Sequence, residues 1–297
     1  MLEESQLNSK SFRVKDYNLS VTLDCGQAFR WEKEAQGWVG VVRNHWLCVS
    51  ESPHSLKIRT TAEHPAWEQI ARYFRLDETI DEITDAFPKD QHLQRAVRDY
   101  KGLRLLRQEP WECLASFILS STKQIPHIQQ IIRRLAQQFG TPLRTPKGAA
   151  LSFGFPSPSR IAQVTEPELR ALGMGYRAPF LKRAAEAIET GELPLQALAD
   201  LTYLEAKEAL QELPGVGPKI AACVLLFAFG HQEAFPIDVW VRRALRELYF
   251  TNQNPTDREL EAFSQSYFGP HSGYAQQYLF HYIRMRHKSK QGKQSQA

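Results

Sequence analysis

A turn built from two glycines and two prolines separates two helical segments in the C-terminal half of the chain, and it constrains the fold more than any other feature. The turn reads LPGVGPK and occupies residues 213–219. Glycine and proline at these spacings favour a tight turn, and proline suits the first turn of a following helix. Residues 203–213 predict a helix before the turn, and the apolar residues 219–229 predict a buried helix after it.

A hairpin of this kind turns unpaired backbone N–H groups and a positive helix N-terminus outward. Gly215 and Gly217 carry no side chain, so another molecule can approach the backbone there. A phosphate can accept hydrogen bonds from such N–H groups without any contact to a base. The hairpin therefore predicts a site that binds the DNA backbone independently of the base sequence. An ordinary pair of packed helices is the alternative interpretation.

Two charged residues stand at the ends of the apolar helix. Lys219 lies in its first turn, and Asp238 directly precedes the helical pattern VWVRRAL. Asp238 is therefore a natural N-cap for the next helix, and Lys219 could simply extend its ammonium into solvent. Both features are common singly, whereas their combination with the hairpin is not.

The stretch resembles the helix-hairpin-helix DNA glycosylase superfamily, which is defined by a Gly/Pro-rich hairpin followed by an aspartate. A lysine at the position of Lys219 marks the members that are both glycosylase and lyase, and the resemblance is closest to the 8-oxoguanine DNA glycosylase family. The resemblance extends from about residue 12 to residue 286. Further matching motifs follow the family's order: CGQAFRW (25–31), GLRLLRQEPWECLASFILSS (102–121), LGMGYRA (172–178) and GYAQQYLF (273–280).

The pattern of the whole chain predicts an α+β fold. Short runs rich in valine, tryptophan and threonine in residues 18–60 predict an antiparallel sheet with Gly37 and Asn44 in turns, and the motif CGQAFRW could be one of its strands. From residue 65 onward the apolar spacing is helical. We therefore expect an N-terminal antiparallel β-sheet lobe followed by a mainly α-helical helix-hairpin-helix glycosylase region. The expected divisions are residues 1–95, residues 96–288 and a basic flexible tail of residues 289–297.

Composition excludes several classes of protein. With 297 residues, 42% of them hydrophobic, the chain can bury a sizeable core, and its net charge of +4 is only weakly basic. Basic residues without acids follow Arg284, and we expect a frayed, solvated end there. Neither a signal peptide nor the roughly 18 apolar residues of a membrane span is evident. We expect no membrane association, and a cytoplasmic, nucleoid-associated protein in a bacterium or a nuclear one in a eukaryote.

The cysteines are too far apart for a zinc or cluster site. We therefore expect reduced thiols and no metal, and the lack of a C-terminal four-cysteine cluster separates the chain from the iron–sulfur branch that belongs to the same superfamily. The four cysteines are Cys25, Cys48, Cys113 and Cys223.

The resemblance implies a bifunctional DNA glycosylase/AP lyase that excises 8-oxoguanine from duplex DNA. Lys219 would be the nucleophile that attacks the anomeric carbon, forms a Schiff base and leads to strand nicking by β-elimination. Only the free amine can attack, so burial and the positive helix N-terminus should favour loss of its proton. Asp238 would stabilise positive charge on the sugar in the transition state. We expect Asp238 to share its charge with the N–H groups of the helix that it caps.

The resemblance also implies a pocket for the flipped base. The backbone carbonyl of Gly26 would accept a hydrogen bond from the N7 hydrogen that 8-oxoguanine has and guanine lacks, while Cys223 and Phe280 would sandwich the base. Gln276 would read its Watson–Crick edge. Cys223 lies four residues after Lys219, and Gln276 lies four before Phe280, so helix geometry puts each pair on one face. A buried thiol and a plain amphipathic helix are the alternatives.

Around the gap in the duplex, Tyr176 resembles the family's wedge and Arg177 its contact to the orphaned base. A tyrosine packed beneath a loop is the alternative for Tyr176. The chain departs from the family at three positions, so opposite-base reading and one phosphate contact should differ. These are Thr122 in place of an asparagine, His127 in place of an arginine and Trp240 in place of a histidine.

The expected partner is double-stranded DNA containing 8-oxoguanine, and we expect the protein to act as a monomer. We expect no cofactor, although backbone carbonyls of the hairpin could hold a monovalent cation. Two other functions remain open from the sequence: a monofunctional glycosylase for another lesion, and a damaged-DNA-binding protein without catalysis. The lysine and aspartate pair argues against both, because a non-catalytic clamp has no need of it.

Overall fold

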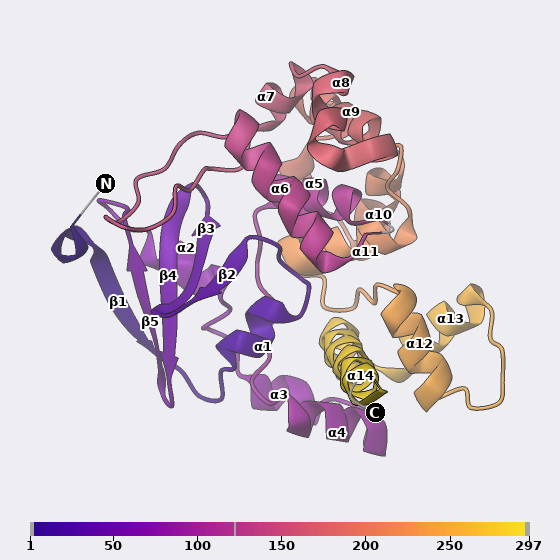
Figure 1. Ribbon diagram of the computed structural model, residues 1–297. Helices are drawn as coiled ribbons and strands as arrows, with labels where there is room; N and C mark the ends of the chain where they lie inside the picture. Colours follow the sequence, from indigo (N-terminus) through magenta and orange to yellow (C-terminus); the bar gives the residue numbers. More distant parts are fainter. Residues whose placement is uncertain (1–2, 122, 295–297) are drawn as a thin grey trace.

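The computed structural model describes residues 3–121 and 123–294, and it combines an N-terminal sheet lobe with a larger helical region (Figure 1). The sheet is five-stranded and antiparallel, with strand order β1-β5-β4-β3-β2. Its register pairs Val49 with Ile58 in the middle of the sheet. The strands are β1 (Asn8–Arg13), β2 (Trp31–Glu34), β3 (Gly37–Val42), β4 (His45–Ser52) and β5 (Ser55–Thr60).

Of the two predicted turn residues, Asn44 lies in a turn, whereas Gly37 is the first residue of β3 and pairs with Glu34. The strands also do not fill residues 18–60. Arg43 and Asn44 both have positive φ (47° and 63°) between β3 and β4, as a two-residue hairpin of primed type requires. The first strand begins earlier, and helix α1 (Leu19–Asp24) interrupts the predicted stretch. Asn18 caps this helix by accepting from the Val21 N–H. The motif CGQAFRW is therefore not a strand, apart from Trp31 at its end.

The helices after the sheet fall where the apolar spacing predicts them, and short helices fill some of the intervening loops. The longer elements carry a buried apolar face, and proline occupies the first turn of several. They are α2 (Trp67–Tyr73), α3 (Ile80–Asp85), α4 (Gln91–Asp99), α5 (Pro110–Ser120), α6 (Ile125–Phe139), α7 (Pro158–Ala162), α8 (Glu166–Leu169), α9 (Ala178–Glu189), α10 (Tyr203–Gln211), α11 (Pro218–Val224), α12 (Val239–Leu248), α13 (Asp257–Tyr267) and α14 (Ser272–Gln294).

Two apolar cores hold the molecule together. One lies between the sheet and helices α1 and α2, and it contains Leu47 and Ile58. The other, larger core lies among the helices and already includes Ile80 of α3 and Leu93 of α4. The predicted division between residues 95 and 96 falls inside α4, so the junction of the two regions is packed helix instead of a linker.

The hairpin of α10 and α11 forms as the sequence predicts. Gly217 occupies the N-cap position of α11, and Pro218 begins the helix. Gly215 has φ +83°, and a Cβ there would lie 2.4 Å from the Phe180 ring, so only glycine fits this turn. A π-helical segment, Leu225–Phe229, continues α11 to the end of the predicted apolar run.

The C-terminal helix α14 corrects one expectation about the tail. It continues through Gln294 and lies beside α12 (Figure 1). Arg284 is buried, and its guanidinium donates a hydrogen bond to the Asp24 carbonyl at 2.9 Å. The chain from Arg284 therefore does not start as a frayed end, because its first residues are anchored against the N-terminal lobe.

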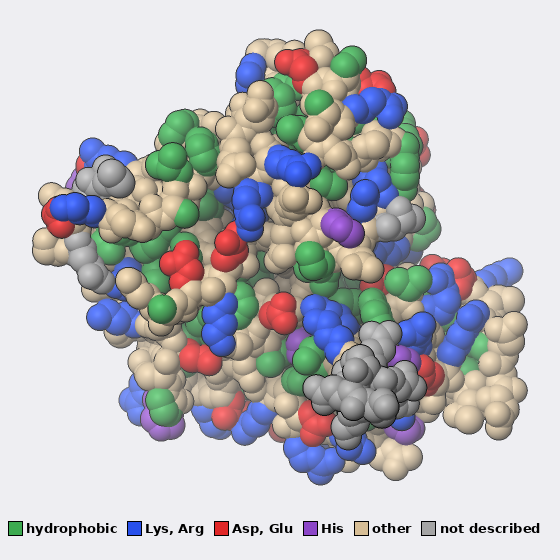
Figure 2. Space-filling model, in the orientation of Figure 1, with side chains coloured by type: hydrophobic (Ala, Val, Ile, Leu, Met, Phe, Trp, Pro, Cys, Tyr) green, Lys and Arg blue, Asp and Glu red, His purple; other side chains and the backbone are tan. Residues whose placement is uncertain are grey.

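Lysine and arginine side chains are spread over the face shown in Figure 2 among acidic ones. This distribution agrees with the small net charge of +4. A DNA-binding role therefore has to rest on the local geometry of particular residues.

Candidate active site

The Lys219 amine lies between helices α5 and α11. Its Nζ donates a hydrogen bond to Ser120 Oγ at 3.4 Å and lies 5.2 Å from the centre of the Phe117 ring. Phe117 is buried and stacks on Phe227 with centroids 5.6 Å apart. Packing of α11 on α5 thus gives the lysine a mostly apolar surrounding with one hydroxyl.

Asp238 is the N-cap of α12, as the sequence predicts. Its Oδ1 accepts hydrogen bonds from the N–H groups of Trp240 at 2.9 Å and Val241 at 2.8 Å. Burial raises the pKa of Asp238, while the Val241 N–H and the charge of Lys219 oppose that rise. The carboxylate is therefore placed near the lysine in a site where its charge is only partly compensated.

A cavity of about 200 Å³ opens beside Lys219, between the hairpin and helix α13. Pro218 and Ala222 contribute to one wall, and Phe235 and Ile237 lie on another. Charged side chains complete the lining, among them Glu233, Arg242 and Asp257, so Lys219 borders a cavity with mixed apolar and charged walls.

The residues expected to form the base pocket come from three separate parts of the chain. Gly26 follows α1, and the position of a Cβ on it would lie 3.5 Å from Phe280 Cζ and 2.9 Å from Ile125 Cδ1. The structure thus brings Gly26 and Phe280 together across more than 250 residues. Gln276 is buried one turn before Phe280, and its Oε1 has no hydrogen-bond partner among the described residues. An unpartnered amide oxygen in this place is available to a ligand.

Cys223 is buried on α11, one turn after Lys219. Burial raises the pKa of its thiol to about 11, and the charge of Lys219 opposes the rise. The thiol is therefore protonated at neutral pH and offers an apolar surface, not a competing nucleophile.

Tyr176 is exposed, as expected of a wedge, whereas Arg177 is not. The tyrosine is 51% exposed and stands between helices α8 and α9. Arg177 is 2% exposed, and its guanidinium donates to the carbonyls of Met174 and Ser121 while lying 4.2 Å from the Tyr176 ring. In this conformation Arg177 supports the tyrosine, so contact with an orphaned base requires the arginine to move.

The sequence differs from the family pattern at three positions, and the structure describes two of them. Thr122 lies outside the described residues. His127 is exposed in the first turn of α6. Trp240 is half-buried, with its ring 5.8 Å from that of His287 and the Arg243 guanidinium 5.1 Å from its centre. A tryptophan held in this way offers a flat apolar surface where a histidine would offer a hydrogen-bond donor.

Sequence reasoning missed Ser120, Phe117 and Ile125 as parts of this site. The first two lie within the motif of residues 102–121 that matches the family, but their spacing is that of an ordinary buried helix. No local signal distinguishes them from core residues. Their proximity to Lys219 and Gly26 is a consequence of tertiary packing.

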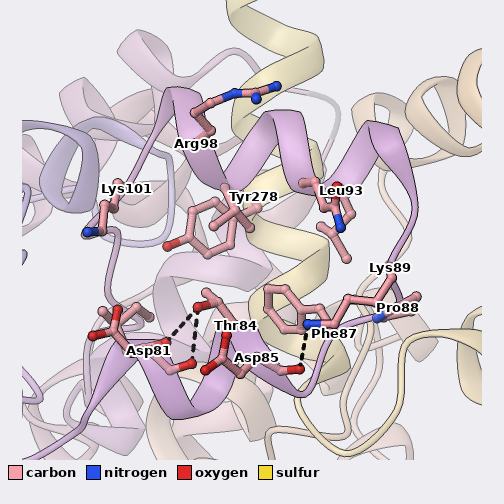
Figure 3. A pocket seen from close by; sticks show the side chains of 13 residues that line it. Asp81, Thr84, Asp85, Phe87, Pro88, Lys89, Leu93, Arg98, Lys101 and Tyr278 are labelled. Atoms are coloured by element: carbon pink, nitrogen blue, oxygen red, sulfur yellow. Dashed lines mark hydrogen bonds between the residues drawn. The ribbon is translucent and has the colours of Figure 1, made fainter.

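Residues 3–121 and 123–294 contain no group of three or more His, Cys, Asp or Glu side chains suited to a metal ion, and no helix there is long and apolar enough to span a membrane. A cavity of about 280 Å³ lies between α3 and α4 over Tyr278 of α14 (Figure 3). None of its lining residues belongs to the cluster around Lys219.

Two models of known protein families match the chain, one over its N-terminal part and one over its helical part. Residues 11–114 match the family described as the N-terminal domain of 8-oxoguanine DNA glycosylase. Residues 115–270 match the HhH-GPD superfamily of base excision DNA repair proteins.

Similar proteins cover most of the chain. A probable N-glycosylase/DNA lyase of Methanothermobacter thermautotrophicus is 31% identical, over 91% of this chain and 95% of its own length. The N-glycosylase/DNA lyase OGG1 of Arabidopsis thaliana is 31% identical, over 89% of this chain and 77% of its own. The solved 8-oxoguanine glycosylase/lyase of Clostridium acetobutylicum, in complex with DNA containing cytosine opposite 8-oxoguanine, has a TM-score of 0.89 at 31% identity, covering 95% of this chain and 98% of that one.

Proposed function

This chain belongs to the 8-oxoguanine DNA glycosylase family of the helix-hairpin-helix superfamily, and we propose that Lys219 and Asp238 carry its reaction. The protein is an enzyme with both N-glycosylase and DNA lyase activity that excises 8-oxoguanine from duplex DNA. The observation that supports the assignment of residues is the site itself. Lys219 and the half-buried Asp238 lie at the starts of two successive helices, close enough for the charge of the lysine to act on the carboxylate.

In the proposed reaction, the neutral amine of Lys219 attacks C1′ of the flipped nucleotide. The glycosidic C–N bond breaks, and its electron pair leaves with the base, which takes up a proton. The attached nitrogen loses a proton, the C1′–O4′ bond breaks with its electron pair going to O4′, which takes up a proton, and a protonated Schiff base remains. A C2′ proton then passes to water, its electron pair forms an enamine, and the enamine expels the phosphate at C3′, which nicks the strand. Each step needs the amine of this chain and no cofactor.

Asp238 has an electrostatic role in this proposal. Positive charge develops on the sugar as the glycosidic bond stretches, and a fixed carboxylate stabilises that charge more in the transition state than in the ground state. The two backbone N–H groups that bind Oδ1 hold the carboxylate in place. Its partial burial strengthens the interaction, because water screens the charge less there than at an exposed site.

The base pocket reads the lesion through one backbone carbonyl. Gly26 accepts the N7 hydrogen of 8-oxoguanine, whereas guanine would present a lone pair to the same oxygen. An unmade hydrogen bond of this kind costs about 1 to 3 kcal/mol. Phe280 and Cys223 hold the base between them, and the unpartnered oxygen of Gln276 accepts from its edge.

The damaged base must leave the duplex first, because the anomeric carbon of its sugar is shielded while the base is stacked in the helix. Tyr176 fills the gap, and the hairpin N–H groups at Gly215 and Gly217 bind backbone phosphate. A monovalent cation on the hairpin carbonyls is compatible with this arrangement. We further propose that the enzyme acts as a monomer, and in the compartment that holds the DNA: the nucleoid of a bacterium or the nucleus of a eukaryote.

Borohydride trapping on a duplex with a single 8-oxoguanine tests the proposal. The expected result is a covalent protein–DNA adduct with the unmodified enzyme and none with Lys219→Gln, while the binding affinity of the variant stays within about tenfold. Lys101→Gln serves as the control, because that lysine is exposed, pairs with Asp16 at 2.9 Å and does not line the cavity beside Lys219.

Three results would contradict the assignment. Normal excision by Lys219→Gln would exclude this lysine as the nucleophile. Base release without an adduct would indicate a monofunctional glycosylase, and tight binding without release would indicate a non-catalytic binding protein.

A further inference from the structure

We infer that Ser120 is a positioning residue for the Lys219 amine, which it orients, together with the Phe117 ring, so that the nitrogen lone pair faces the incoming sugar. This inference rests on the proposed role of Lys219. It adds a requirement that the nucleophile itself does not supply, because a free lysine amine rotates about its terminal carbon–carbon bond and points its lone pair in several directions.

The hydroxyl of Ser120 is already committed as a donor. It lies in the last turn of α5, and its Oγ donates to the Phe117 carbonyl at 2.7 Å. Only the lone pairs of Oγ remain for Lys219, whose Nζ lies 3.4 Å away. Lys219 must therefore be the donor in this contact, which assigns one N–H of the amine to Ser120.

We assign a second N–H of the amine to the face of the Phe117 ring. The lysine nitrogen lies 5.2 Å from the ring centre, and an N–H that points at an aromatic face is weakly stabilised. The ring itself is fixed, because it stacks on Phe227 with a centroid distance of 5.6 Å and meets the edge of Phe29 at the same distance.

A neutral amine has four tetrahedral directions: its carbon, two hydrogens and one lone pair. When Ser120 and Phe117 take the two hydrogens, the lone pair occupies the direction that remains. Asp238 does not compete for an N–H, because its Oδ1 accepts from backbone N–H groups and no ion pair within 4.0 Å joins the described residues Lys219 and Asp238.

Preorganisation of this kind affects the chemical step and leaves DNA binding largely unchanged. A misplacement of about 1 Å at a reacting group can cost about 100-fold in rate. For Ser120→Ala we expect Schiff-base formation to slow by about 10- to 100-fold, with the affinity for DNA within about threefold of the unmodified enzyme. Ser120→Thr keeps the hydroxyl and should restore most of the rate.

The experiment measures single-turnover Schiff-base formation on a duplex with a preformed abasic site, trapped by cyanoborohydride between pH 6 and pH 9. Affinity is measured separately on a duplex with a tetrahydrofuran abasic analogue, which cannot react. The matched control is Ser121→Ala, because the Ser121 hydroxyl contacts only the Ile118 carbonyl, at 3.5 Å, among the described residues. Thermal unfolding of each variant monitors the loss of the bond from Ser120 to Phe117.

Each outcome bears on one of the two ideas. A rate for Ser120→Ala that matches the unmodified enzyme at every pH would overturn the positioning role. So would equal losses in the Ser120 and Ser121 variants, or a failure of threonine to restore the rate, because these would indicate a structural effect at the end of α5. Absence of any adduct with the unmodified enzyme would instead contradict the proposed function.

Discussion

Lys219 and Asp238, both among the described residues, share one site without forming an ion pair. The lysine donates to Ser120 at 3.4 Å, while the aspartate Oδ1 accepts from two backbone N–H groups at 2.8 and 2.9 Å. Each group thus has its own partner. The sequence suggested such a division because a carboxylate in contact with the lysine would favour the ammonium, and an ammonium cannot attack.

Asp238→Asn should remove most of the glycosylase activity without destabilising the fold. Asparagine caps a helix about as well as aspartate, so the hydrogen bonds to Trp240 and Val241 survive. Single-turnover base release measures activity, and thermal unfolding measures stability. A parallel loss of both would show that the carboxylate is mainly structural.

The same variant should respond to pH in a defined way. Burial raises the pKa of Asp238 above its ordinary value of 3.8, so the folded state binds the proton more tightly than the unfolded state does. Protonation of Asp238 stabilises the fold below that ordinary value, and this contribution is lost as the pH rises through the raised pKa. We therefore expect Asp238→Asn to be at least as stable as the unmodified protein at pH 7, with any advantage vanishing near pH 4.

Gly26→Ala should impair base excision far more than lyase activity on a preformed abasic site. The glycine has φ +78°, and an added Cβ would press on Ile125 at 2.9 Å and on Phe280 at 3.5 Å. The base pocket would narrow, whereas an abasic sugar needs no base pocket. The two activities are compared on matched duplexes, and equal losses in both would place Gly26 outside the base pocket.

Recognition of the opposite base should be weak in this enzyme. Thr122 replaces a family asparagine, and a rotating hydroxyl discriminates less than a planar amide with a fixed donor and acceptor. A bidentate reading is worth about 1 to 3 kcal/mol. We expect less than about tenfold preference for cytosine over thymine or guanine opposite the lesion, and Thr122→Asn should raise it. Excision rates on four duplexes that differ only in that base decide the matter, and a strong cytosine preference would assign this reading to another residue.

His281 should make stability depend on pH between about pH 6.5 and pH 4. Burial beside Tyr100, with ring centroids 4.5 Å apart, lowers its pKa from 6.5 to about 4. His281 binds a proton less tightly in the folded protein than in the unfolded chain. Its contribution to the free energy of unfolding is therefore present above pH 6.5 and is lost as the pH falls through about 4. The difference between the two pKa values corresponds to about 3 kcal/mol of stability at most. His281→Phe keeps the aromatic contact and should flatten this part of the curve in denaturant titrations. An unchanged slope would assign the pH dependence to other groups.

Local sequence determined the elements of the site. The turn of Gly215 and Gly217 between helical patterns predicts α10 and α11, and an aspartate before an apolar helical run predicts the N-cap at Asp238. These features are decided within one or two helical turns, because backbone conformation and capping depend on neighbouring residues. The resemblance to the family, which is also carried by contiguous motifs, was confirmed by the comparisons.

Tertiary structure alone decided what surrounds those elements. Ser120 meets Lys219 across 99 residues, Gly26 meets Phe280 across the two regions, and Arg177 folds under Tyr176 instead of pointing outward. Helical spacing could not predict these contacts, because it records which face of a helix is apolar and not which helix covers it. That choice depends on how the whole set of apolar faces packs into one core. The orientation of the nucleophile is therefore a property of the packing of α5 on α11.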